Sequence, residues 1–162
     1  MTFKYEIRTD AGYKDNTSTH YYRIRSQGKT LKSKRFNSLS SSAIEAEALS
    51  IITALQYAVE RDLRGVIIKT DCLNLTRLVN DRSINIDKFV KANERKAGVN
   101  GEMLKRDIVH LRKMKDAIKA QMRHVPRSHN HIADRECKRA KIDKKISGFR
   151  FRKYSRYGLA ES

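Results

Sequence analysis

The pattern of apolar and polar positions predicts five strands. Apolar and β-branched residues alternate or run together over residues 3–9, 20–25, 31–36, 66–70 and 122–127, as is typical of strands bounded by turn residues. The first three runs follow one another closely, which predicts an antiparallel meander. The fourth run has apolar residues at consecutive positions, which indicates a strand buried on both faces.

Helical periodicity appears between and after these strands. One apolar face repeats through residues 44–59 at the spacing of an α-helix, and it consists of Ile44, Ala48, Ile51, Ile52, Leu55 and Val59. Further helices are expected directly after Asp71, over about residues 103–120 and over 132–142, whereas residues 81–101 are polar and predict an irregular excursion. The order of elements predicts an α/β fold with a mixed sheet flanked by helices.

Composition and charge restrict the classes of protein and partner. The chain has 162 residues, is 39% apolar and carries a formal net charge of +18, which fits a single domain that binds a polyanion. Two cysteines are too few for a disulfide framework and match no common zinc signature. The start of the chain lacks the apolar core of a signal peptide, and no apolar run reaches the length of a membrane span. We therefore expect a soluble cytoplasmic protein.

Four acids stand at the ends of predicted elements. Asp10 follows the first strand, Glu47 lies in the first turn or two of the long helix, Asp71 ends the strand at 66–70, and Asp134 opens the last helix. A mixed sheet can bring these positions together, and clustered carboxylates raise one another's pKa unless a cation compensates them. Mg²⁺ prefers oxygen ligands, and paired Mg²⁺ ions are suited to phosphodiester cleavage.

The segments around these acids resemble a known family. In order along the chain they are IRTDAGYK, AEALSIITAL, VIIKTDCLNL and VPRSHNHIADRECKRA. They are similar to the four successive motifs of type 1 ribonuclease H and its retroviral-type relatives, and they span residues 3–140. Singly each motif is weak, but the order, approximate spacing and structural context of all four agree with the family.

The resemblance implies a fold, an activity and a cofactor. The implied fold has a five-stranded sheet, with three antiparallel strands and two parallel ones. The implied activity is endonucleolytic hydrolysis of the RNA strand of RNA/DNA hybrids, giving 5′-phosphate products, with two Mg²⁺ or Mn²⁺ ions. Position by position, the catalytic and metal-binding acids would be Asp10, Glu47, Asp71 and Asp134.

Glu45 competes with Glu47 for the place of the helix acid. Ser42 and Glu45 have the spacing of a capping box, in which the Glu side chain returns to the Ser backbone N–H. Glu47 also stands at the distance that the resemblance implies before the pair Ala54-Leu55. We therefore assign Glu47 to the site and Glu45 to the helix cap.

The loop before Asp134 holds candidates for a further role that the resemblance implies, in the reaction or in product exit. Arg127 is a candidate for binding phosphate, and His129 or His131 for moving a proton, since histidine has an unperturbed pKa of about 6.5. His129 is assigned to the catalytic set here, with His131 and Arg127 left open as alternatives for the same role.

Basic residues predict how nucleic acid is held. The residues expected to contact it are Lys14, Arg112, Lys113, Arg127, Arg150, Arg152 and Lys153. Residues 1–143 are expected to form the ribonuclease H-like domain, and residues 144–162 a tail in which aromatic and basic side chains alternate. Such a tail can stack on bases and bind phosphates, or it can pack its aromatic side chains on the core.

Two other functions compete with hydrolysis. A non-catalytic ribonuclease H-like module or an RNA-associated structural protein would share the charge, but neither needs all four acids. The expected protein is a monomer that binds nucleic acid and no membrane.

Overall fold

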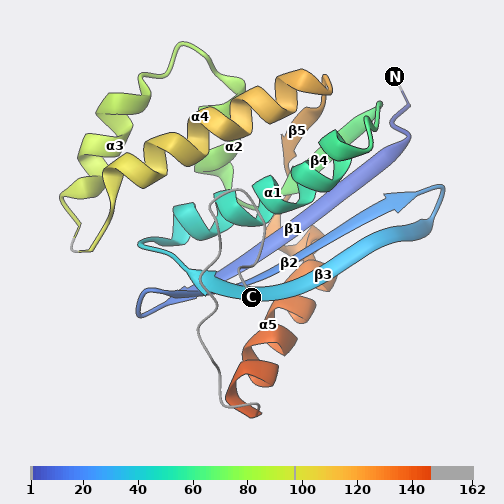
Figure 1. The fold of residues 1–162 in the computed structure, drawn as a ribbon, viewed down its shortest axis with the longest axis horizontal. Helices are drawn as coiled ribbons and strands as arrows, with labels where there is room; N and C mark the ends of the chain where they lie inside the picture. Colours follow the sequence, from blue (N-terminus) through green and yellow to red (C-terminus); the bar gives the residue numbers. More distant parts are fainter. Residues whose placement is uncertain (1, 97, 147–162) are drawn as a thin grey trace.

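A five-stranded mixed sheet forms the centre of the molecule (Figure 1), in a computed structural model that describes residues 2–96 and 98–146. The strand order is β3-β2-β1-β4-β5. The first three strands pair antiparallel, and β4 and β5 run parallel to β1. Their bounds are β1 Tyr5–Lys14, β2 Thr17–Ser26, β3 Lys29–Leu39, β4 Val66–Thr70 and β5 Gln121–His124. The predicted sheet of three antiparallel and two parallel strands is confirmed.

Helices cover both faces of the sheet. The helical elements are α1 Ala43–Glu60, α2 Leu73–Asn80, α3 Ile86–Glu94, α4 Gly101–Ala117, the 3₁₀ turn η1 Arg127–His129 and α5 His131–Ile146. Helix α1 contacts β1, β2 and α4, whereas α5 contacts β1, β2 and β3. Figure 1 shows α1 and α4 on one side of the sheet and α5 on the other. Such two-sided covering is the usual architecture of a mixed sheet.

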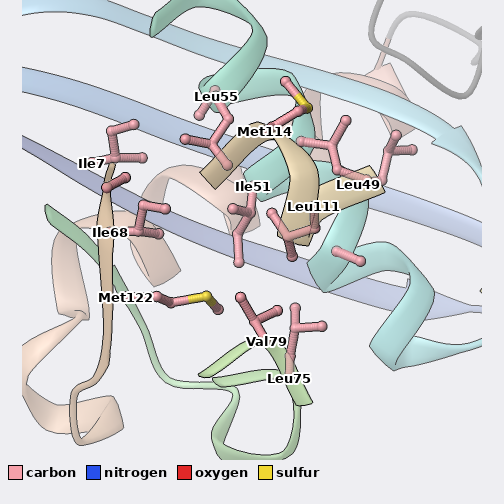
Figure 2. Packing of buried hydrophobic residues seen from close by; sticks show 14 of the residues in the cluster. Ile7, Leu49, Ile51, Leu55, Ile68, Leu75, Val79, Leu111, Met114 and Met122 are labelled. Carbon is pink, nitrogen blue, oxygen red and sulfur yellow. The ribbon is translucent and has the colours of Figure 1, made fainter. Parts of the chain in front are cut away.

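The main hydrophobic core lies between the sheet and α1. Ile7, Ile68 and Met122 stand side by side on β1, β4 and β5, and Figure 2 shows them near Ile51 and Leu55 of α1. The four isoleucine and leucine side chains are fully buried. Each contributes about 1.5–3 kcal/mol relative to an exposed position, so the predicted apolar face of the long helix anchors α1 against the sheet.

The first hairpin differs from the prediction. Strand β1 does not end before Asp10 but continues to Lys14, because its backbone stays paired with β2 as far as Thr17. The chain reverses at Asp15 and Asn16, which have φ values of 52° and 60°, as a two-residue hairpin turn requires. Asp10 therefore lies inside a strand rather than after it.

The region between residues 81 and 101 is also more regular than its polar composition predicts. It contains α3, which begins where the Asn85 side chain accepts a hydrogen bond from the Lys88 backbone N–H. Only Val90 of this helix is buried, so its apolar face is too narrow to produce a clear periodic signal.

The last predicted strand is too long at its end. Strand β5 stops at His124, two residues before Pro126, which has no N–H to donate to a neighbouring strand. The Val125 backbone N–H still reaches across to the Thr70 carbonyl at 2.9 Å. This bond holds the loop that follows β5 against the end of β4.

Among the described residues, no helix combines the length and apolar character needed to cross a membrane.

Candidate metal centre

Asp10 lies in the middle of β1, which is the central strand of the sheet. It pairs with Tyr21 of β2, and its side chain is buried. On one side the Asn130 side chain donates to the Thr9 carbonyl at 2.9 Å. On the other, Ser50 of α1 donates to the Asp10 carbonyl at 3.3 Å. The loop before α5 and helix α1 are thus both tied to the backbone that carries Asp10.

Glu47 is placed by the start of α1. The helix begins at Ser42, whose hydroxyl accepts a hydrogen bond from the Glu45 backbone N–H at 3.2 Å. The Glu45 carboxylate accepts from the Ser41 backbone N–H at 2.7 Å, one residue earlier than the predicted return to Ser42. Glu45 therefore closes the start of the helix, and Glu47, half a turn further on, extends toward Asp10.

Asp71 follows directly on β4, as predicted. The Thr70 hydroxyl accepts a hydrogen bond from the Cys72 backbone N–H at 3.2 Å, so the chain turns sharply between β4 and α2. This turn leaves the Asp71 side chain at the end of the strand that lies beside β1.

These three acids come together although they are distant in the sequence. One carboxylate oxygen from each of Asp10, Glu47 and Asp71 lies within 4.8 Å of the others. Below they are called the acid trio. Burial, followed by the charges of Asp71 and Asp134, raises the pKa of Asp10 to about 7. Burial, followed by the charges of Asp10 and Asp71, raises the pKa of Glu47 well above its ordinary value.

One oxygen of the trio has no hydrogen-bond donor. Oε2 of Glu47 is buried and has no partner among the described residues. A buried carboxylate oxygen without a donor is costly, and three carboxylates this close repel one another when ionised. A divalent cation would relieve both costs, since hard cations prefer carboxylate oxygens. The residues present therefore fit a divalent metal ion.

Asp134 stands beside the trio but outside it. It lies in the first turn of α5 and makes ion pairs with Lys138 at 3.0 Å and with Arg127 at 3.4 Å. The hydrogen bond from Lys138 is the largest influence on its pKa, which is lowered. Asp134 is thus close enough to act on Asp10 electrostatically, while its oxygens are held by two basic side chains.

Arg127 and His129 occupy different positions around the site. The exposed guanidinium of Arg127 opposes the pKa increases of Asp10 and Glu47, so it faces the acids. His129 instead lines a cavity of about 150 Å³ with Arg8 and Arg23 on the α5 side of the sheet, and its carbonyl accepts a hydrogen bond from Arg8. Of these two residues, Arg127 is the one that faces the acids.

A buried histidine, which the sequence did not indicate, is connected to the backbone of Asp10 through a hydrogen-bond network. His20 of β2 is fully buried; its Nδ1 lies 2.7 Å from the Ser50 hydroxyl, and its Nε2 lies 2.7 Å from the hydroxyls of Ser18 and Ser38. Burial lowers the pKa of His20 to about 3, so the ring is neutral. Because Ser50 also donates to the Asp10 carbonyl, this network fixes β1 relative to α1. His20 lies among polar residues in the sequence of β2, so the pattern of apolar and polar positions did not indicate that it is buried.

The residues predicted to contact nucleic acid are scattered. Lys14 is exposed at the end of β1, and Lys113 lines an open hollow on α4. Arg112 donates to the Leu78 carbonyl at 2.8 Å and so caps the end of α2. Arg150, Arg152 and Lys153 lie outside the described residues, as does most of the predicted tail.

Comparison of the sequence with protein families decides the relationship. The profile of the reverse transcriptase-like family matches residues 24–140, a span that contains Glu47, Asp71 and Asp134. The chain belongs to this family, within the ribonuclease H-like superfamily. Asp10 precedes the matched span, and its place in the ribonuclease H-like domain rests on the structure. A search of curated proteins finds no match.

Solved structures support the same fold. RNase H1 from the halophilic archaeon Halobacterium salinarum has a TM-score of 0.69 at 17% identity, with 86% of this chain and 98% of that chain covered. LC11-RNase H1, isolated from compost by a metagenomic approach, has a TM-score of 0.68 at 21% identity, with 88% and 98% covered. The latter protein has also been solved in complex with an RNA/DNA hybrid. The N-terminal RNase H domain of a Mycobacterium tuberculosis protein has a TM-score of 0.68 at 17% identity, with 91% and 99% covered. These likenesses establish the ribonuclease H fold for this chain.

Proposed function

We propose that this protein is a metal-dependent endonuclease that hydrolyses the RNA strand of RNA/DNA hybrids. The observation that carries the proposal is the acid trio, in which three carboxylates from β1, α1 and the end of β4 converge. One buried oxygen of Glu47 has no donor within residues 2–96 and 98–146. A structural protein gains nothing from this arrangement, because ionised carboxylates at such distances destabilise the fold. A nuclease requires it to hold its cations.

The chain's own residues have separate parts in this chemistry. Asp10, Glu47 and Asp71 would hold two Mg²⁺ or Mn²⁺ ions, and Asp134 would complete the set after release from Arg127 or Lys138. Bound divalent cations supply Lewis acidity for phosphodiester hydrolysis at neutral pH. Arg127 would bind the scissile or neighbouring phosphate, and His129 or His131 remains the candidate for proton transfer. Water would add to phosphorus and give up a proton, and the 3′-oxygen would depart and take up a proton, which leaves 5′-phosphate and 3′-hydroxyl ends.

The proposed substrate follows from charge and from the related structures. The net charge of +18 favours a polyanion. The similar LC11-RNase H1 has been crystallised with an RNA/DNA hybrid, and the foamy viral protease-reverse transcriptase, 15% identical with a TM-score of 0.60, is also known with such a hybrid. We propose that Lys14, Lys113 and Arg127 contact the hybrid, and that the protein acts as a monomer.

A cleavage assay tests the proposal. The RNA strand is end-labelled in an RNA/DNA hybrid, an RNA duplex and single-stranded RNA, and a DNA duplex is included as a fourth substrate. Each is incubated with Mg²⁺, Mn²⁺ or EDTA. We expect cleavage of the hybrid alone, with either metal and not with EDTA. If the hybrid stays intact with both metals while it is still bound, the protein is a non-catalytic nucleic-acid-binding module.

A further inference from the structure

The sheet face opposite α1 carries a row of basic side chains. Arg23 of β2 stands opposite Arg8 of β1, Arg8 stands beside Lys69 of β4, and Lys69 stands beside Arg123 of β5. Directly paired residues project from the same face of a sheet. These four residues, called the cation ladder below, therefore cross four neighbouring strands on one face.

The same four strands are not polar throughout, because the residues next to the ladder residues form an apolar row on the other face of the sheet. Each ladder residue has a sequence neighbour in this apolar row, which consists of Ile24, Ile7, Ile68 and Met122. All four are buried in the core. The strands thus alternate between an apolar row facing α1 and a cationic row facing away from it.

Like charges in directly opposite positions destabilise a sheet, and the ladder has little acid to offset them. Glu6 is the acid that pairs with the ladder. Its Oε1 lies 2.8 Å from Nε of Arg8, and its Oε2 lies 2.8 Å from Nζ of Lys69. Arg23 and Arg123 make no ion pair among the described residues. A row of four cations with one acid is an electrostatic cost that a bound anion would remove.

Arg23 shows most directly that an anionic partner fits. Its Nε is buried and has no hydrogen-bond partner in the part of the chain that the structure describes, which is unfavourable for a charged donor. The side chain lines the cavity of about 150 Å³ together with Arg8 and Arg25. At the other end of the ladder, Arg123 is exposed on the edge strand, with its guanidinium 5.3 Å from the centre of the Phe3 ring. Helix α5 contacts β1, β2 and β3, and its residues Ile132 and Ala133 line the same cavity as Arg8 and Arg23. Helix α5 therefore covers part of this end of the ladder, whereas Arg123 stands on the edge strand β5.

We propose that the cation ladder binds the sugar–phosphate backbone of a single nucleic-acid strand. Strands lie about 4.8 Å apart, so the row extends over about 14 Å, which is too long for one phosphate group. A phosphodiester chain presents a charge at every unit, and planar guanidinium groups form paired hydrogen bonds with phosphate oxygens. An aromatic ring at the edge, Phe3, can stack on a base. This binding does not depend on the proposed hydrolysis, because none of the ladder residues belongs to the acid trio.

Single-stranded DNA in EDTA is the probe, because the proposed activity neither cleaves it nor proceeds without metal. Binding is measured by fluorescence anisotropy over a series of salt concentrations with the full chain. In the ladder variant, Arg23 and Arg123 are both changed to Gln. The matched control changes Arg61 and Lys88 to Gln; these exposed cations lie on or beside α1 and α3, outside the ladder. Each double variant loses the same charge.

The ladder variant is expected to bind about tenfold more weakly at low salt, and its slope of log K against log[salt] should be shallower by about 1.4, since each single-strand phosphate contact contributes about 0.7. In the control variant, neither the affinity at low salt nor the salt slope should change by a comparable amount. Equal weakening in both variants would mean diffuse attraction and overturn the proposal, as would unchanged binding by the ladder variant. If a polyglutamate peptide displaces the DNA at equal charge, the partner is an acidic protein instead.

Folding of the ladder variant is checked by its melting temperature, which should hold or rise because like-charge repulsion is removed. If the double variant does not fold, Arg123→Gln alone serves, since this side chain is exposed on the edge strand. It should make the slope shallower by about 0.7, and no change in the slope would refute the ladder.

Discussion

Single carboxylates decide the chemistry of this molecule, and each has a cost in the fold. Asp10 has a pKa of about 7 because burial and the charges of Asp71 and Asp134 disfavour its ionised form. An acid whose pKa is higher in the folded chain than in the unfolded chain loses stabilisation as the pH rises between the two values. Without metal, the acid trio therefore destabilises the fold at neutral and alkaline pH.

Replacing Asp71 by Asn separates catalysis from folding. Hydrolysis of the hybrid should nearly stop, because a carboxylate ligand is lost. Without metal, the melting temperature at about pH 8 should hold or rise, because Asp10 loses a neighbouring negative charge that raises its pKa. Hybrid affinity in EDTA should also hold or increase. The measurements are turnover, melting temperature and affinity, each with wild type as reference.

Two outcomes would contradict this role for Asp71. A variant that cleaves at nearly the wild-type rate would place the reaction elsewhere. A variant that neither folds nor binds would make Asp71 a structural residue of the turn between β4 and α2.

Asp107 makes a second pH-dependent contribution, away from the acid trio. It lies on α4 with no exposed surface, and burial raises its pKa to about 7. Its folded pKa is above the ordinary 3.8, so its protonated form favours folding at low pH, and this contribution is lost as the pH rises from about 4 to about 7. Asp107→Asn should therefore be more stable than wild type at about pH 8, by on the order of 2–4 kcal/mol.

Denaturant unfolding in EDTA at a series of pH values checks this expectation. The difference between Asp107→Asn and wild type cancels the titration of Asp10 and Glu47, which both proteins share. Below about pH 4 the stabilities of wild type and Asp107→Asn should converge, because Asp107 is then protonated in both the folded and the unfolded chain. A constant difference at every pH would show that the effect comes from packing and not from ionisation.

At the scale of elements, the start of α1 assigns two nearby acids to different tasks. Glu45 accepts hydrogen bonds from the backbone N–H and hydroxyl of Ser41, whereas Glu47 reaches the acid trio. Glu47→Gln should abolish hydrolysis with little loss of stability. Glu45→Gln should retain activity and lose about 1 kcal/mol of stability, as is typical for a weakened helix cap.

Turnover and unfolding free energy, measured on both variants, test this division. The two variants are matched in chemistry and lie two residues apart, so each is the control for the other. A loss of turnover in Glu45→Gln with an unchanged melting temperature would reverse the assignment of the two residues.

At the scale of the whole molecule, charge governs how the protein meets its substrate. The net charge of +18 predicts that hybrid affinity falls steeply with salt, with a slope of about 0.9 for each phosphate neutralised on a duplex. Deleting residues 148–162, which include Arg150, Arg152 and Lys153, should reduce both the affinity and the slope. The acid trio is untouched, so cleavage at saturating substrate should persist.

Binding titrations at several salt concentrations, with full-length and truncated chains, test the predicted loss of affinity and of salt dependence. The melting temperature of the truncated chain is the control for folding. If truncation unfolds the protein, the tail packs on the domain, and an unchanged salt slope would show that the tail makes no phosphate contacts.

The sequence by itself determined the order of elements and the candidate acids. The periodicity of α1 and the apolar run of β4 are local signals, because each depends on residues within one or two turns or strand repeats. Asp71 was placed correctly at the end of β4 for this reason. The resemblance to ribonuclease H added the pairing of these strands, three antiparallel and two parallel, which the observed sheet confirms. Helix α3 was missed because one buried residue leaves no periodic face.

Only the tertiary structure decided how these positions meet. The position of Asp10 within β1 depends on its pairing with β2, and the position of Asp134 depends on the packing of α5 on the sheet. The alignment of Arg8, Lys69 and Arg123 depends on the register between β1, β4 and β5, which lie far apart in the chain. A shift of one residue in the pairing would turn each strand's side chains to the other face. The register is set by packing the buried row of Ile7, Ile24 and Ile68 against α1, a contact between distant segments that no local pattern contains.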